Sequence, residues 1–84
     1  MRQYEPIWAE LKRLGTVRIA APKALHRRII KATVKEKYQD YGYRLEMMQK
    51  NQSIRLEYTR NTSVIEFRLI KTYRIMNAVS LADI

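Results

Sequence analysis

Cysteine is missing from this chain of 84 residues, so neither a disulfide nor a thiolate metal site can stabilise the fold. Long apolar runs are missing as well. No stretch approaches the roughly 18 apolar residues that cross a bilayer, and residues 1–5 lack the apolar core of a secretion signal. We therefore expect a cytoplasmic protein with no membrane partner, because a reducing compartment suits a chain without disulfides.

Signatures of catalysis and of cofactor binding are also missing. Gly15 and Gly42, the only glycines, do not have phosphate-loop spacing, and no Ser/His/Asp set or paired-carboxylate signature occurs. His26 is the only histidine and has no acidic residue three or four positions further along its predicted helix. We interpret His26 as a packing residue. The sequence predicts no enzyme activity, no cofactor and no metal site.

Two acidic residues, Glu36 and Asp40, stand four positions apart, a spacing that suits a shared Mg²⁺. Ion pairing with the neighbouring Lys35 and Lys37 is the simpler interpretation of the same residues.

The chain does contain enough apolar material for one packed core. Hydrophobic residues make up 46% of it, which favours a folded domain over a disordered tail. A chain of this length has room for a single domain, residues 1–84. So small a domain buries only about 60% of the surface that its unfolded chain exposes, so we expect modest stability.

Three elements are predicted in the first half. Ile7, Trp8, Leu11 and Leu14 form one apolar stripe, which predicts a helix over residues 6–14 that ends at Gly15, and Trp8 is expected to anchor the core. Residues 16–20 alternate like a short strand. Pro22 then marks the start of a long helix over residues 23–41, for which Gly42 is the expected stop.

The second half alternates with a period of two residues, which predicts strands over residues 43–48, 54–59 and 65–69. Charge matching predicts the register of the first hairpin, with Glu46 opposite Arg55 and Arg44 opposite Glu57. Residues 73–75 extend the third strand or form a fourth, and Ser80 is a candidate cap for a last helical turn.

These elements predict an α+β fold. Its order is a short helix, a short strand, a long basic amphipathic helix and then a three-stranded antiparallel meander packed under the helices. The meander has four strands if residues 73–75 form one of their own.

Positive charge is the strongest functional signal. Seventeen Lys and Arg against eight Asp and Glu give a net charge of +9, and residues 12–37 alone hold nine basic residues and one acid. At 100° per residue, Arg27, Arg28, Lys31 and Lys35 share the arc of the long helix that the core does not need. Such a local surplus is typical of a surface that binds a polyanion.

Aromatic residues follow the basic helix. Tyr38 lies near the basic arc and is a candidate for stacking on a base, whereas the spacing of Tyr41, Tyr43 and Tyr58 predicts that they face the core. The predicted contacts with nucleic acid are therefore six residues: Lys23, Arg27, Arg28, Lys31, Lys35 and Tyr38.

Three functions remain open. The first is a small nucleic-acid-binding protein, with a regulatory role as one option, that contacts phosphates of DNA or RNA through the second helix. The second is a basic inhibitor or adaptor that docks on an acidic face of a larger protein. The third, which the sequence favours least, is a small toxin-type ribonuclease. An unpaired sheet edge also suits a homodimer.

Overall fold

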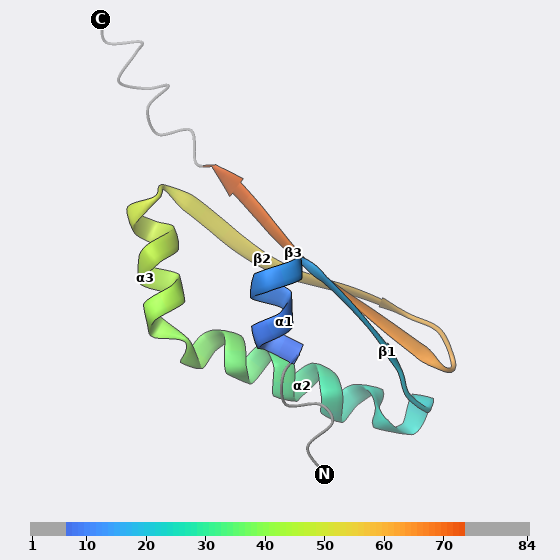
Figure 1. Ribbon diagram of the computed structural model, residues 1–84. Coiled ribbons are helices and arrows are strands. Elements are labelled where there is room, and N and C mark those ends of the chain that lie inside the picture. The colour runs from blue at the N-terminus through green and yellow to red at the C-terminus, as the bar shows by residue number, and fades with distance from the viewer. Residues whose placement is uncertain (1–6, 74–84) are drawn as a thin grey trace, which may run out of the picture.

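The computed structural model describes residues 7–73. Within them the chain forms an α+β fold, as predicted (Figure 1). Three helices pack on a three-stranded antiparallel sheet. The elements in chain order are α1 (Ile7–Leu14), β1 (Thr16–Ala20), α2 (Lys23–Gln39), α3 (Tyr41–Gln49), β2 (Gln52–Arg60) and β3 (Val64–Tyr73). The predictions for Pro6, for residues 74–75 and for the turn that follows Ser80 lie outside the described residues.

The first helix follows the predicted pattern. Ile7, Trp8 and Leu11 are buried, whereas Leu14, the last member of the predicted stripe, is 59% exposed. Gly15 ends the helix with a φ of +86°, and its backbone N–H donates to the carbonyl of Leu11 at 2.8 Å. A residue with a side chain would be strained in that backbone conformation, which explains the glycine.

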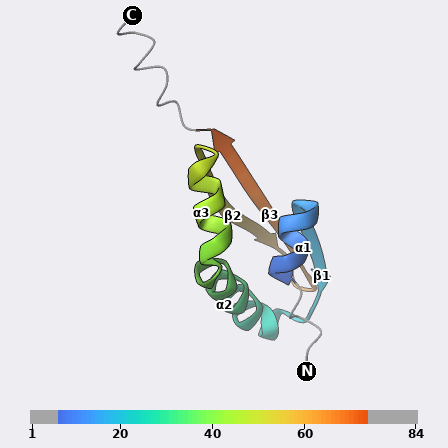
Figure 2. The same cartoon turned by 60° about the vertical axis from the view of Figure 1, so that its left-hand side comes forward.

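The sheet has the strand order β1-β3-β2, with both pairs antiparallel. Strands β2 and β3 form the hairpin predicted between residues 54–59 and 65–69. Strand β1 occupies the other side of β3, so that Val17 lies opposite Phe67 and Ile19 opposite Ile65. Because successive side chains of a strand alternate between its two faces, these four residues point to the same face of the sheet. Helices α1 and α2 cover this face (Figures 1 and 2).

Residues 43–48 do not form the predicted strand; they belong to α3. The predicted register of Glu46 with Arg55 and of Arg44 with Glu57 is therefore wrong, and β1 supplies the third strand of the sheet. Glu46 instead pairs with Lys50, one helical turn further on, at 2.9 Å.

The pattern of apolar residues in this segment fits both a strand and a helix. Tyr43 and Met47 share a parity, as strand neighbours do, but they are also four residues apart and so share one side of a helix. Met47 is buried and Tyr43 is half-buried, whereas Leu45 is 55% exposed, which is the helical arrangement. Leu, Glu, Met and Gln all have high helix propensity, and this preference favours the helix over the strand.

The core lies between the sheet and the first two helices. Leu11, Ile29, Ile65 and Phe67 have exposed fractions of 1% or less. His26 is fully buried among them, and its Nε2 donates to the carbonyl of Ala21 at 2.8 Å. The interpretation of His26 as a packing residue is thus confirmed, and its hydrogen bond holds the start of α2 against the end of β1.

The two glycines offer a test of the helical assignment of residues 41–49. Gly42 lies inside α3, its φ is not positive, and a Cβ would meet nothing within 4 Å. Gly42→Ala should therefore raise the free energy of unfolding by about 0.5 kcal/mol, because alanine has the higher helix propensity. Gly15→Ala should lower it by about 1 kcal/mol, because alanine is strained at positive φ. Urea denaturation followed by Trp8 fluorescence measures both.

The two variants control each other, since both add one methyl group in open space. A Gly42→Ala protein as destabilised as Gly15→Ala would show that residues near 42 are not helical.

Candidate nucleic-acid interface

Helix α2 turns one side to the core and the other to solvent. Its fully buried side chains, His26, Ile29 and Thr33, recur three and four residues apart. The Thr33 hydroxyl donates to the Ile29 carbonyl at 2.9 Å, which lets a polar side chain lie in the core. These three residues determine the rotation of the helix, so the opposite side must face away from the sheet (Figure 2).

That outer side carries the predicted cations. Lys23, Arg27, Arg28, Lys31 and Lys35 are all exposed. Arg27, Lys31 and Lys35 follow one another at intervals of four residues, and Arg28 lies beside them on the same arc. We call Arg27, Arg28, Lys31 and Lys35 the basic stripe.

The basic stripe has no compensating anion within residues 7–73: none of its four side chains makes an ion pair or a hydrogen bond there. By contrast, Lys12, Lys50 and Arg55 each lie 2.7 to 2.9 Å from a carboxylate oxygen. The stripe is therefore a group of four neighbouring cations that are free to attract an external anion.

The position of these cations in the helix is unfavourable for folding. The first turn of α2 contains no acidic residue and begins with Lys23, whereas Arg27 and Arg28 lie in the second turn. The N-terminal end of a helix carries partial positive charge, so a cation there costs about 0.3 to 1 kcal/mol. Repulsion between cations four residues apart adds to this cost.

Two exposed tyrosines lie where α2 meets α3. Tyr38 is 57% exposed and Tyr41 is 72% exposed. The Arg44 guanidinium carbon lies 5.9 Å from the ring centroid of Tyr38 and 5.1 Å from that of Tyr41, and Arg44 Nη1 donates to the Tyr38 carbonyl at 2.8 Å. Lys37 Nζ lies 4.7 Å from the Tyr38 ring centroid. We call these four residues the aromatic corner.

Of the three tyrosines predicted to face the core, Tyr43 is half-buried and packs edge-on against Trp8, with centroids 5.5 Å apart. For Tyr41 the prediction was wrong, because α2 ends at Gln39 and α3 starts on a new axis, so the periodicity of α2 does not extend to it. Tyr58 lies 6.2 Å from the Phe67 ring but is 45% exposed.

Asp40 holds the aromatic corner in place. Its carboxylate accepts hydrogen bonds from Trp8 Nε1 at 2.9 Å and from Lys12 Nζ at 2.7 Å, both on α1. It also accepts from the backbone N–H of Tyr43 at 3.1 Å, which caps α3. The expected pairing with Lys35 or Lys37 is thus replaced by a tertiary contact with α1.

These contacts change the acidity of Asp40. The hydrogen bonds from Lys12 and then from Trp8 stabilise the ionised form and hold the pKa of this carboxyl below its ordinary value of 3.8, against the opposing effect of burial. The Lys12 ammonium also lies over the Trp8 and Tyr43 rings, 6.0 and 5.5 Å from their centroids.

A groove of about 430 Å³ opens beside the aromatic corner, between α3 and the start of β2. Its apolar lining includes Met47, Met48 and Ile54, and Lys37, Tyr41 and Arg44 also line it. Leu45 and Met48 are 55% and 60% exposed there. Prediction missed this surface because residues 43–48 were assigned to a strand; Asp40, followed by helix-forming residues, was the available signal.

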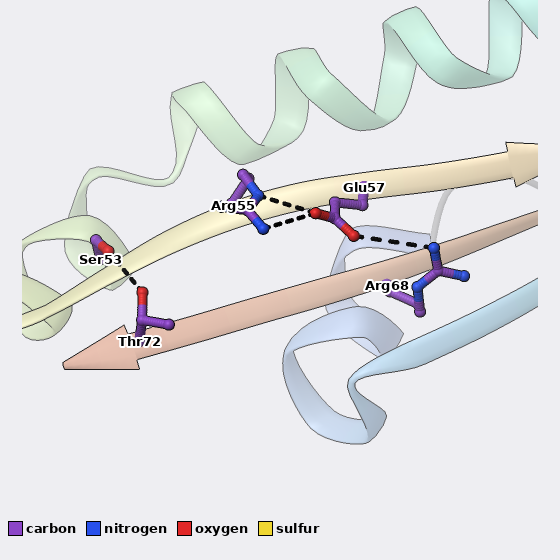
Figure 3. Close-up of polar contacts among 5 residues, drawn as sticks. All are labelled: Ser53, Arg55, Glu57, Arg68 and Thr72. Carbon is purple, nitrogen blue, oxygen red and sulfur yellow. Dashed lines mark hydrogen bonds and ion pairs between the residues drawn. The ribbon is translucent and has the colours of Figure 1, made fainter.

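The outer face of the sheet has a different electrostatic character. Glu57 pairs with Arg55 at 2.7 Å and with Arg68, across the strands, at 3.8 Å, and the hydroxyls of Ser53 and Thr72 are 3.0 Å apart (Figure 3). On this face one carboxylate therefore serves two guanidinium groups, so its arginines have a partner within the protein.

Residues 7–73 contain no group of three or more His, Cys, Asp and Glu side chains that could hold a metal ion. No helix in this part of the chain is long and apolar enough to cross a bilayer.

Comparison with protein-family models, with curated proteins and with solved structures found no match to this chain.

Asp40 should make a pH-dependent contribution to stability. Asp40→Ala removes the cap and both contacts with α1, and should lower the free energy of unfolding by about 2 kcal/mol near neutral pH. Asp40→Asn keeps a capping oxygen and should cost about half as much. Because the folded-state pKa is depressed, the advantage of wild type over Asp40→Asn is complete above about pH 5 and declines as the pH falls below about 3.8. Urea denaturation of both proteins at several pH values measures this difference in the free energy of unfolding.

Glu10→Gln serves as the control, because Glu10 makes only a loose exposed pair with Arg13 at 4.0 Å. It should change stability by less than about 0.5 kcal/mol. An advantage of wild type over Asp40→Asn that is the same at all pH values would contradict the role of the ionised carboxylate.

Proposed function

We propose that this protein binds nucleic acid, contacting backbone phosphates through the basic stripe on α2. The observation that carries the proposal is the concentration of exposed cations without partners on one side of one helix. Phosphates attract Lys and Arg, and the release of condensed counterions supplies the free energy of binding.

The dimensions of the stripe support this proposal. From Arg27 to Lys35 the helix rises about 12 Å, at about 1.5 Å per residue. A nucleic acid strand presents a phosphate every few ångströms along its axis, so several phosphates can be contacted at once. The bound phosphates would also relieve the repulsion among the cations and the unfavourable interaction of Lys23 with the helix N-terminus.

The sheet is a weaker candidate for the same role. Glu57 neutralises Arg55 and approaches Arg68 on its outer face, and the described residues of that face form no row of aromatic side chains. Stacking of bases on a sheet depends on such a row.

A second candidate function is docking on an acidic protein. Exposed Leu45 and Met48, next to Lys37 and Arg44, favour it, since protein interfaces combine an apolar centre with a polar rim. The two functions differ in their response to nuclease. A partner captured by tagged protein through nucleic acid is released by nuclease, whereas a directly bound protein is not.

Neutralising the stripe should weaken binding in a way that salt reveals. The variant Arg28→Gln, Lys31→Gln, Lys35→Gln should bind a labelled oligonucleotide more weakly than wild type. Its slope of log affinity against log salt should be shallower by about 0.7 to 0.9 for each phosphate that the variant no longer neutralises. Fluorescence anisotropy at several salt concentrations measures both quantities.

The matched control is Arg13→Gln, Arg18→Gln, Arg60→Gln, which removes the same charge from exposed positions on α1, β1 and β2. It should keep most of the affinity and most of the slope. The proposal fails if wild type binds neither DNA nor RNA, or if both triple variants are weakened to the same degree. A purified protein that cleaves RNA would point instead to the ribonuclease hypothesis.

A further inference from the structure

We propose that the aromatic corner and the adjoining groove bind unpaired bases, so that the ligand of this protein is a single-stranded nucleic acid. The inference rests on the proposed function and goes beyond it by naming the form of the ligand and a second contact region. Its evidence is a different set of residues from the basic stripe.

The first observation is the presentation of the two rings. Tyr38 and Tyr41 are 57% and 72% exposed although each lies beside at least one cation. Arg44 reaches both rings from α3, and its hydrogen bond to the Tyr38 carbonyl restricts its position. An exposed ring with a neighbouring cation attracts an electron-rich base by stacking and a phosphate by charge.

The second observation is continuity with the basic stripe. Tyr38 is three residues after Lys35 and seven after Lys31, so it lies on the same side of α2. A strand whose phosphates follow the stripe would therefore carry its next nucleotides to Tyr38 and then, past the end of α2, to Tyr41. Both sets of contacts can be made by one strand at the same time.

The third observation is the chemistry of the groove. Its volume of about 430 Å³ falls in the range of small-ligand sites, about 300 to 1,000 Å³. Met47, Met48 and Ile54 offer apolar surface for the flat face of a base. Tyr41 and Arg44 belong to both the groove and the aromatic corner.

Charge and base accessibility select the occupant. A second copy of this chain placed on the groove across a two-fold axis would bring its own Lys37 and Arg44 toward these cations, at an electrostatic cost. A duplex holds its bases stacked inside, so their faces cannot reach the tyrosines without unpairing. Single-stranded nucleic acid supplies negative charge for the cations and free base faces for the rings.

The corner is also held in position before any ligand arrives. Asp40 lies between Tyr38 and Tyr41 in the chain and is fixed to α1 by Trp8 and Lys12. Little further ordering of the backbone is then required for binding, which favours affinity.

The test compares a labelled single strand of about 12 nucleotides with the duplex of the same sequence. Tyr38→Ala, Tyr41→Ala should bind the single strand more weakly than wild type, by about tenfold for each ring removed. Its affinity for the duplex and the slope of its salt dependence should stay as in wild type, because every cation that meets a phosphate is still present. Tyr38→Phe, Tyr41→Phe keeps both rings and should restore single-strand affinity.

The outcomes separate this inference from the proposed function. If wild type binds neither form of nucleic acid, both fail. If the Arg28, Lys31, Lys35 variant loses binding but Tyr38→Ala, Tyr41→Ala binds the single strand as wild type does, the inference alone is wrong. A phenylalanine variant as weak as the alanine variant would also overturn stacking.

Sedimentation of the free protein tests the competing occupant. We expect a monomer at the concentrations used for binding. A dimer that Met48→Lys dissociates would place a second copy on the groove and overturn the inference.

Discussion

Asp40 accepts hydrogen bonds from Trp8 and Lys12 on α1 and from the backbone of Tyr43 on α3, and the arrangement of the helices depends on this one carboxylate. By capping α3 it starts a new helix directly after α2. By binding α1 it fixes the corner between α2 and α3 against the core. Near this corner Met47 of α3 is buried, whereas Tyr38 at the end of α2 and Tyr41 at the start of α3 are exposed. A partly buried ionised group in this position remains favourable because each contact is with a donor.

Composition alone does not distinguish the cations that have carboxylate partners from those that have none. On α1, α3 and the sheet, Lys12, Lys50 and Arg55 have carboxylate partners and contribute to the structure. On α2, the four residues of the basic stripe have no such partner within the described part of the chain. Repulsion within the stripe lowers the free energy of unfolding, which is small for a chain of this length. A polyanion that binds only the folded protein would raise it again.

Local patterns predicted the parts of the fold in which only one structure fits the residues. The apolar stripe and Gly15 predicted α1, and Pro22 with the spacing of His26 and Ile29 predicted the start and the inner side of α2. The hairpin of β2 with β3 followed from alternation and a polar link. Tyr43 and Met47 would share one side in a helix as well as in a strand, so their spacing does not distinguish the two. Gly42, which lies inside α3, was taken as a helix stop. Tyr41 was misplaced for a different reason, since the periodicity of α2 ends at Gln39.

By itself, the sequence determined that the chain has an α+β fold with four exposed cations on the outer side of its second helix. These properties depend on the spacing of residues along single elements, which the chain order fully specifies. Only the tertiary structure decided that β1 completes the sheet, that Asp40 bonds to α1 and that Arg44 reaches Tyr38 and Tyr41 beside a groove. Trp8 and Lys12 are 32 and 28 residues away from Asp40 in the chain, and no local pattern encodes a contact over such a separation.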